Sequence, residues 1–346
     1  MVRRRGRADG ALRTTIGQVA ALAAVSTATV SRVLNHPQSV RASLRDRVDG
    51  AVAQLGYLPN QTARALSSLH TGLVGVLAPS LAGTYPPVVE AVEQRLREAG
   101  YAMLLATSGG ADEHAATLAR AMAGREIEGL LLLGIQVPDT LGVLLAQRRI
   151  PYVLADAVGE VGAEGPVVGV DYALAGWTVG AYLLGLGHRR LAFCHRASPG
   201  DLRGEALLSG IRAALTDAGA TPLAVWSLPA CVSAAHGELR NWLAVEPPTA
   251  LICADDLLAM EALRLCVALG VAVPARMSIV GCGDLPFARH AIPTLTTLRV
   301  PHTSIGRVAV EQLLAQFGGR SVTGQSFPAK LVVRQSSGPA RAHRET

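Results

Sequence analysis

The chain has 346 residues, of which 50% are hydrophobic and 17% are charged. That length exceeds one ordinary domain and that composition excludes a disordered chain, so we expect two or three packed domains. Residues 1–71 carry ten basic and three acidic residues, a net charge of +7, whereas the remainder carries 22 basic and 23 acidic residues, a net charge of −1. A basic head on a nearly neutral body indicates that the head binds nucleic acid or an acidic membrane surface.

The five cysteines are odd in number and lack the spacing of a disulfide framework or a zinc site, so we expect reduced, mostly buried thiols and no metal or cofactor. The only lysine, Lys330, is followed by leucine, which excludes a phosphate loop ending in Gly-Lys-Ser/Thr. No apolar run reaches the roughly 18 residues of a membrane helix. The run VAALAAV at 19–25 follows arginines, as in a secretory signal, but it is too short and is enclosed by Gln18 and Ser26.

Residues 15–58 have the pattern of three short helices. Apolar residues recur at helical spacing over 16–23, 30–34 and 44–55, and Gly56 is placed to end the third helix. Thr15 is expected to cap the first helix, and Ser26 or Thr27 the second. The second helix would present Thr27, Ala28 and Arg32 outward, which suits base edges in a major groove but is also typical of ordinary solvated surface. This arrangement predicts a helix-turn-helix domain.

Two segments flank these helices. Residues 1–14 form a basic tail that is expected to be disordered, with its arginines either solvated or in contact with phosphates. Residues 59–71 begin with proline and have little apolar surface, so a helix there would be marginal in isolation and would form when docked.

Four ordered blocks resemble the N-terminal signature of the LacI/GalR family of bacterial transcription regulators: Val19-Ala20, the segment 25–35, the segment 55–60 and the segment 63–66. The resemblance implies that some head residues read bases, that others hold phosphates, and that Leu66 is the lever of a hinge helix that wedges a base step apart in the minor groove. The DNA-binding residues implied in this way are Thr15, Ser26, Thr27, Ala28, Thr29, Ser31, Arg32, Asn35, Ser39, Tyr57, Asn60, Ala63 and Leu66. The head departs from the family pattern at Gly17-Gln18, at Ala24, where a turn glycine is usual, and at Arg41, where serine is usual.

From residue 72 onward, short apolar runs alternate with amphipathic stretches. Such runs occupy 73–78, 102–106 and 129–133 in a first series, and 168–170, 191–194, 250–253 and 278–280 in a second. Continuous apolar strands between helices predict doubly wound parallel sheets in two lobes. Blocks such as 185–193 and 331–334 resemble the effector domains of the same family, which implies a body similar to a periplasmic sugar-binding protein.

The predicted fold class is therefore an all-α helix-turn-helix head followed by an α/β two-lobed periplasmic-binding-protein-like body with parallel sheets. The expected boundaries are 1–14 for the tail, 15–58 for the head, 59–71 for the hinge and linker, 72–334 for the body and 335–346 for a second tail. Within the body, residues 72–170 and 300–334 are expected in the first lobe and residues 171–299 in the second.

A ligand cleft between the lobes would need polar groups at strand ends, and Tyr85, Asp156, Asp171, Asp255 and Asp284 are the expected effector-binding residues. Alternatives exist: Asp171 could only stabilise the crossing between lobes, and Asp256 is expected to cap the helix that begins at Leu257.

Two departures from the family pattern bear on the effector. The family commonly has an arginine where Leu207 stands and a ligand-contacting aspartate where Gly283 stands. Both are clamps for hydroxyl or charged groups, so this chain is expected to bind something other than a simple hexose in the usual way.

The function implied is a cytoplasmic, nucleoid-associated repressor whose affinity for a pseudo-palindromic double-stranded operator is modulated by a small-molecule effector. We expect a homodimer, because the tail after residue 334 has no leucine heptad for tetramer formation. We expect no membrane partner. An exported solute-binding receptor with the same body is the alternative, but it would leave residues 35–70 unexplained. An enzyme is not expected, because GxSxG, HExxH and strand-linked GxGxxG motifs are absent.

Overall fold

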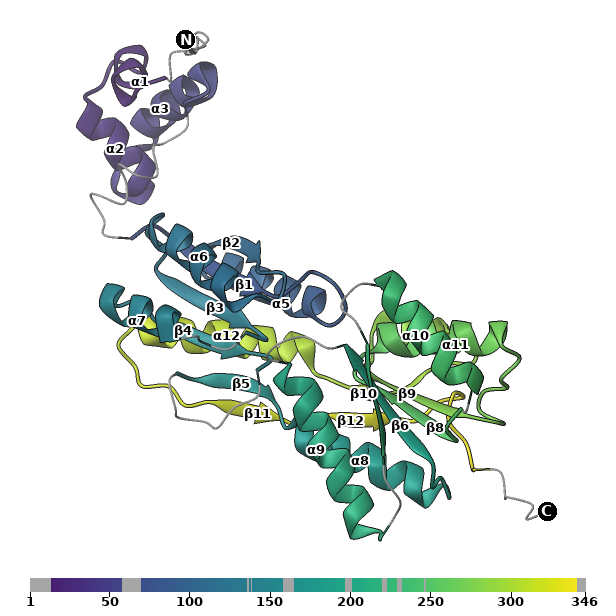
Figure 1. Ribbon diagram of the computed structural model, residues 1–346. Coiled ribbons are helices and arrows are strands. Elements are labelled where there is room, and N and C mark those ends of the chain that lie inside the picture. Colours follow the sequence, from purple (N-terminus) through teal and green to yellow (C-terminus); the bar gives the residue numbers. More distant parts are fainter. Residues whose placement is uncertain are drawn as a thin grey trace, which may run out of the picture. The chain divides into compact units, whose positions relative to one another are not determined.

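A computed structural model describes residues 14–57, 70–135, 137, 139–157, 165–196, 201–219, 223–228, 232–245 and 247–340 (Figure 1). The chain divides into two compact units, Met1–Thr71 and Gly72–Thr346. The predicted hinge residues Asn60, Ala63 and Leu66 lie outside the described residues, as do residues 1–13 of the predicted basic tail.

The first unit contains the three predicted helices, here called the head (residues 14–57). They are α1 (Ile16–Leu22), α2 (Thr27–Asn35) and α3 (Ala42–Leu55), with a short 3-10 helix, η1 (Pro37–Ser39), between the last two. α1 and α2 are bent by 102° to one another, as helix-turn-helix geometry requires. A small apolar core holds them together: Val19, Ala20, Ala23, Val30, Val33, Val48, Ala51 and Tyr57.

Among the described residues, no single helix is long and apolar enough to cross a membrane; α1 and α2 pass that test only as a bent pair.

The body has two six-stranded sheets, one in each lobe (Figure 1). The first has the order β11-β5-β4-β3-β1-β2 and is parallel throughout. Its strands are β1 (Leu73–Ala78), β2 (Ala102–Thr107), β3 (Gly129–Leu133), β4 (Tyr152–Ala155), β5 (Val167–Val170) and β11 (Gln325–Phe327). Its helices are α5 (Tyr85–Glu98), α6 (Asp112–Ala123), α7 (Asp139–Arg148) and α12 (His302–Phe317). We call this the first lobe.

The second sheet has the order β12-β10-β9-β8-β6-β7, with β12 antiparallel to β10 and the other strands parallel. Its strands are β6 (Leu191–Arg196), β7 (Ala224–Leu228), β8 (Ala250–Cys253), β9 (Ser278–Gly283), β10 (Thr296–Arg299) and β12 (Lys330–Val332). Its helices are α8 (Tyr172–Gly185), α9 (Leu202–Asp217), α10 (Val232–Val245), α11 (Asp256–Ala268) and the 3-10 helix η2 (Pro286–His290). We call this the second lobe, and the two parallel-dominated sheets confirm the predicted fold class.

The C-terminal segment differs from the sequence prediction. α12 and β11 belong to the first lobe as expected, but β12 pairs with β10 in the second lobe. Residues 335–340 are no free tail: Ser336 is fully buried, its carbonyl accepts the Ile279 N–H at 2.7 Å, and its hydroxyl accepts the Thr296 N–H at 2.8 Å. The segment covers the edge of β10, whose backbone groups would otherwise lack partners.

Helices α8 and α9 pack closely because glycine lies where their backbones meet. A Cβ atom added at Gly210 would overlap the carbonyl oxygen of Ala173, and one at Gly176 would overlap that of Leu207. Leu207 is 2% exposed and belongs to the core of the body. Its side chain therefore serves packing at a position where the family commonly has an arginine.

Candidate DNA-binding surface and effector site

The N-terminal turn of α2 is held by its own side chains. The Ser26 hydroxyl accepts the Thr29 N–H at 3.1 Å and lies 2.9 Å from the Thr29 hydroxyl. Thr27, Ala28 and Arg32 are exposed on the same helix. The three residues expected to read bases thus project from a helix whose first turn is already capped.

The residues expected to hold phosphates also have local partners. Ser31 and Asn35 are half-buried, and the Asn35 amide donates to the Ser31 hydroxyl at 3.3 Å. The Ser39 hydroxyl donates to the His36 carbonyl at 2.7 Å. Tyr57 differs from the others, because it is 8% exposed and packs in the core of the head. The Tyr57 ring therefore packs in the core of the head, and its contact with DNA stays a prediction.

The turn between α1 and α2 is held by a residue that sequence reasoning missed. Ala24 has φ 48°, a left-handed conformation that favours glycine, at the place where the family usually has one. The Arg47 guanidinium, from α3, donates to the carbonyls of Ala23 at 3.1 Å and Ala24 at 2.8 Å. It satisfies backbone groups at the end of α1, an interaction that links residues 24 apart in sequence.

The departure at Gly17-Gln18 also has a structural role. The Gln18 side chain accepts the Thr15 N–H at 2.8 Å, while the Thr15 hydroxyl accepts the Gln18 N–H at 3.4 Å. These two bonds form a capping box at the start of α1. The predicted cap at Thr15 is confirmed, and its hydroxyl serves the helix.

In the body, the five expected effector residues have different local partners. Tyr85 and Asp156 lie together, whereas Asp171 is an exposed cap of α8 whose carboxylate accepts the Leu174 N–H at 2.8 Å. Asp255 caps α11 by accepting the Leu258 N–H at 2.8 Å. The prediction that Asp256 caps this helix was wrong by one residue.

An arginine that the sequence prediction omitted joins Tyr85 and Asp156. Arg203, in the first turn of α9, donates from one guanidinium nitrogen to the Asp156 carboxylate at 2.7 Å and to the Thr84 hydroxyl at 3.0 Å. Its guanidinium carbon lies 4.9 Å from the centre of the Tyr85 ring, in cation–π geometry. The other Asp156 oxygen accepts the Tyr172 hydroxyl at 2.6 Å. Arg203 lies four residues before Leu207, where the family commonly has an arginine. Because four residues make one helical turn, an arginine on the same helix face was visible in the sequence.

The residues around Arg203 stabilise its positive charge. Asp156 is 0% exposed and Arg203 is 25% exposed. Burial alone would lower the pKa of Arg203, but Tyr85, Asp156, Tyr172 and Asp201 outweigh it, and the pKa is raised well above its usual value. Burial raises the pKa of Tyr85 to about 12 and the pKa of Tyr172 well above its usual value, so both phenols stay protonated at neutral pH.

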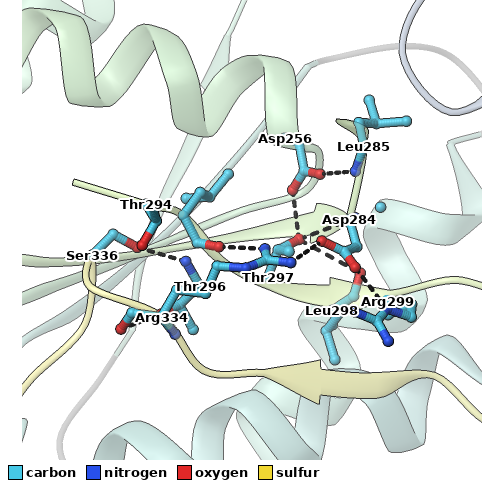
Figure 2. Close-up of polar contacts among 12 residues, drawn as sticks. Asp256, Asp284, Leu285, Thr294, Thr296, Thr297, Leu298, Arg299, Arg334 and Ser336 are labelled. Carbon is cyan, nitrogen blue, oxygen red and sulfur yellow. Dashed lines mark hydrogen bonds and ion pairs between the residues drawn. The ribbon is translucent and has the colours of Figure 1, made fainter. Parts of the chain in front are cut away.

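Asp284 lies in a separate clamp (Figure 2). Its carboxylate, 3% exposed, accepts from Arg299 and from Arg334, each at 2.6 Å. Burial would raise the pKa of Asp284, but these hydrogen bonds outweigh it and the pKa is lowered. Both Asp284 oxygens are engaged by arginines, so this carboxylate joins β9, β10 and the C-terminal segment, and its contact with an effector stays a prediction.

Asp256 is a buried carboxylate that has no arginine partner among the residues that the structure describes (Figure 2). It accepts the Leu285 N–H at 2.7 Å and the Thr297 hydroxyl. Burial raises the pKa of Asp256 to about 6 despite these two bonds. The neighbouring Gly283 has φ 135°, a backbone conformation that strains a residue with a side chain, and a Cβ atom there would lie 3.2 Å from the Thr84 side chain.

Four of the five cysteines, Cys194, Cys253, Cys266 and Cys282, are free and buried, as predicted; Cys231 lies outside the described residues. Burial raises the pKa of Cys194 and of Cys266 to about 12, which makes these thiols inert at neutral pH. Within the described ranges, no three His, Cys, Asp or Glu side chains come together in a way that could hold a metal ion.

Comparison with known proteins agrees with both units. The family described as "Bacterial regulatory proteins, lacI family" matches residues 15–60, and the "Periplasmic binding protein-like domain" matches residues 181–337. The HTH-type transcriptional repressor PurR of Escherichia coli is 32% identical over 343 residues, which cover 95% of this chain and 99% of that protein.

Two solved structures extend the likeness. The lac repressor dimer bound to operator and the anti-inducer ONPF has a TM-score of 0.83 and 25% identity, over 94% of this chain and 99% of that chain. The transcriptional regulator CelR in complex with cellobiose has a TM-score of 0.68 and 29% identity, over 94% and 100%.

The chain therefore belongs to the LacI family of bacterial regulatory proteins. It is a DNA-binding transcriptional repressor, and the alternative of a solute receptor is not favoured, because PurR matches both the head and the body.

Proposed function

We propose that the protein is a cytoplasmic, nucleoid-associated homodimer that binds a pseudo-palindromic operator through α2 of each head. The observation that carries this proposal is the capped α2 helix with Thr27, Ala28 and Arg32 exposed on its surface. The lac repressor, bound to its operator as a dimer, provides the parallel for the assembly. A dimer would place two such helices in successive major grooves of a two-fold symmetric site.

A small molecule modulates operator affinity in this proposal, and it binds where Tyr85, Asp156 and Arg203 meet. The relatives are bound to ONPF and to cellobiose, which are ligands of those proteins. Here Leu207 is a core residue and Gly283 has no side chain, so the effector is not a simple hexose held by the family's usual arginine and aspartate. The role is regulatory and not enzymatic.

The test of DNA binding begins with genome-wide mapping of bound sites, which supplies the operator. Fluorescence anisotropy with that duplex then compares the full chain with Arg32→Ala and with Arg212→Ala, an exposed arginine of α9. Loss of a base contact is expected to weaken specific binding about 10- to 100-fold. The control changes the charge equally without touching the head, so similar affinities for the two variants would refute the assignment of α2.

The hinge is tested by Leu66→Ala. If Leu66 wedges a base step, this variant loses affinity for the operator while the body stays folded and dimeric. Circular dichroism and sedimentation check the fold and the assembly, and unchanged operator affinity would exclude the hinge role.

A further inference from the structure

The contact between Arg203 and Asp156 joins the two lobes. Arg203 belongs to α9 of the second lobe, whereas Asp156 follows β4 of the first lobe and Thr84 and Tyr85 open α5 of the same lobe. The guanidinium thus reaches from one lobe into a group of three residues on the other. It makes one ion pair, one hydrogen bond and one stacking contact there.

The first-lobe side of this contact has the features of a cation-binding site. Asp156 is fully buried and supplies the negative charge, and the Tyr85 ring offers a face to a planar cation. Asp201, the cap of α9, adds a second carboxylate that raises the pKa of Arg203 after the opposing effect of burial. The negative groups around the guanidinium therefore outnumber the single positive charge that they surround.

The nearby histidine does not supply a second cation. His302 is 7% exposed, and its Nε2 atom lies 3.2 Å from the Gly283 carbonyl oxygen. Burial lowers the pKa of His302, with a smaller opposing effect from Asp156, so the ring is neutral at pH 7. Charge compensation of Asp156 in this group thus depends on Arg203.

We propose that Arg203 occupies this contact as an intramolecular ligand, and that the effector is an organic cation that takes the place of its guanidinium. The inference rests on the proposed effector function and specifies the chemical class of the effector. A neutral or anionic molecule that displaced Arg203 would leave Asp156 buried without a counter-charge, which is strongly unfavourable. A cation with a planar or compact head retains both the ion pair with Asp156 and the stacking on Tyr85.

The test removes the Arg203 guanidinium by mutation and then supplies a small guanidinium compound in solution. In the full chain, Arg203→Ala removes the guanidinium and leaves Asp156 in place. Ethylguanidinium chloride is expected to raise the melting temperature of this variant and to bind it in calorimetry, and to bind the wild type more weakly, because there it must displace the Arg203 guanidinium. N-ethylurea has nearly the same shape without the charge, and sodium acetate supplies an anion; neither is expected to stabilise the variant.

Two further variants separate the charge effect from general destabilisation. Arg203→Met combined with Asp156→Asn removes both charges, and this double variant is expected to fold without any response to ethylguanidinium. Arg203→Lys retains a cation and is expected to melt above Arg203→Ala and to respond less to the probe. Equal responses to ethylguanidinium and N-ethylurea, stabilisation by acetate, or a double variant that responds like Arg203→Ala would each overturn the proposal.

Operator binding provides an independent measurement. If the wild type binds its mapped operator but no variant shows selective binding of ethylguanidinium, the cationic effector is excluded and the repressor function stands. If the wild type binds no mapped site, the DNA-binding assignment itself fails, whatever the calorimetry shows.

Discussion

The head and the body use polar side chains in different ways. In the head, most polar contacts join residues three or four apart, as in Ser26 with Thr29 and Ser31 with Asn35. In the body, the buried carboxylates find partners far away in sequence: Asp156 with Arg203 over 47 residues, and Asp284 with Arg334 over 50. The head therefore presents a locally determined surface to DNA, whereas the contacts between the lobes exist only once the body has folded.

This contrast has a consequence for regulation. A surface whose side chains are oriented within one helical turn changes little when other parts of the molecule move. A buried ion pair between lobes responds to any change in their separation, because its energy depends steeply on distance and on exclusion of water. The body is thus the region in which a bound molecule can alter the conformation.

The largest effect is expected in the body, from Gly210→Ala. The added methyl group would overlap the Ala173 carbonyl of α8, and separating two tightly packed helices is expected to cost more than about 3 kcal/mol of unfolding free energy. Urea unfolding of the full chain measures the change. Gly237→Ala is the matched control, because nothing lies within 4 Å of that exposed helical position; it is expected to leave stability unchanged or to raise it slightly. Equal stabilities of the two variants would contradict close packing of α8 and α9.

A smaller effect is expected from pH, through Asp256. Because burial raises its folded pKa from 3.8 to about 6, the ionised carboxylate lowers the stability of the folded body by about 3 kcal/mol at pH 7. The folded state binds the proton more tightly than the unfolded state, so stability from this residue rises as the pH falls from 7, by about 1.3 kcal/mol at pH 5. Urea unfolding at both pH values is expected to show a smaller rise in Asp256→Asn than in the wild type. Identical pH dependence in the two proteins would show that Asp256 is not buried in this way.

The smallest effect is expected in the head, from Ala24→Gly. Glycine adopts the left-handed conformation of this turn without the steric cost of a Cβ atom, so the variant is expected to stabilise the head by about 1 kcal/mol. Hydrogen exchange of the α1 and α2 amides measures the head separately from the body. Faster exchange in the variant would mean that the turn does not need this conformation.

The sequence predicted the head well because helices and caps are local. The spacing of apolar residues located all three helices, and the caps at Thr15 and Ser26 are present. The ring of Tyr57, which the resemblance placed among the DNA-binding residues, lies in the core of the head. Arg47 was missed because its partners belong to another helix, and no local pattern encodes that contact.

The partners of the expected effector residues were predicted less well, because they come from distant segments of the chain. The rule of polar groups at strand ends selected Tyr85 and Asp156, which Arg203 joins, and also Asp171 and Asp255, whose carboxylates cap helices. Asp284 was chosen for its position after a strand, and only the fold brings Arg299 and Arg334 to it.

The sequence by itself determined that this is a DNA-binding protein with a two-lobed body, because charge distribution, helical periodicity and apolar strands are properties of contiguous segments. It also determined the family, through motifs that keep their order and spacing. Only the tertiary structure decided which charges meet: that Arg203 compensates Asp156 between the lobes, and that residues 330–340 complete the second lobe. The reason is that a buried charge must find its partner in space, and that partner need not be near in sequence.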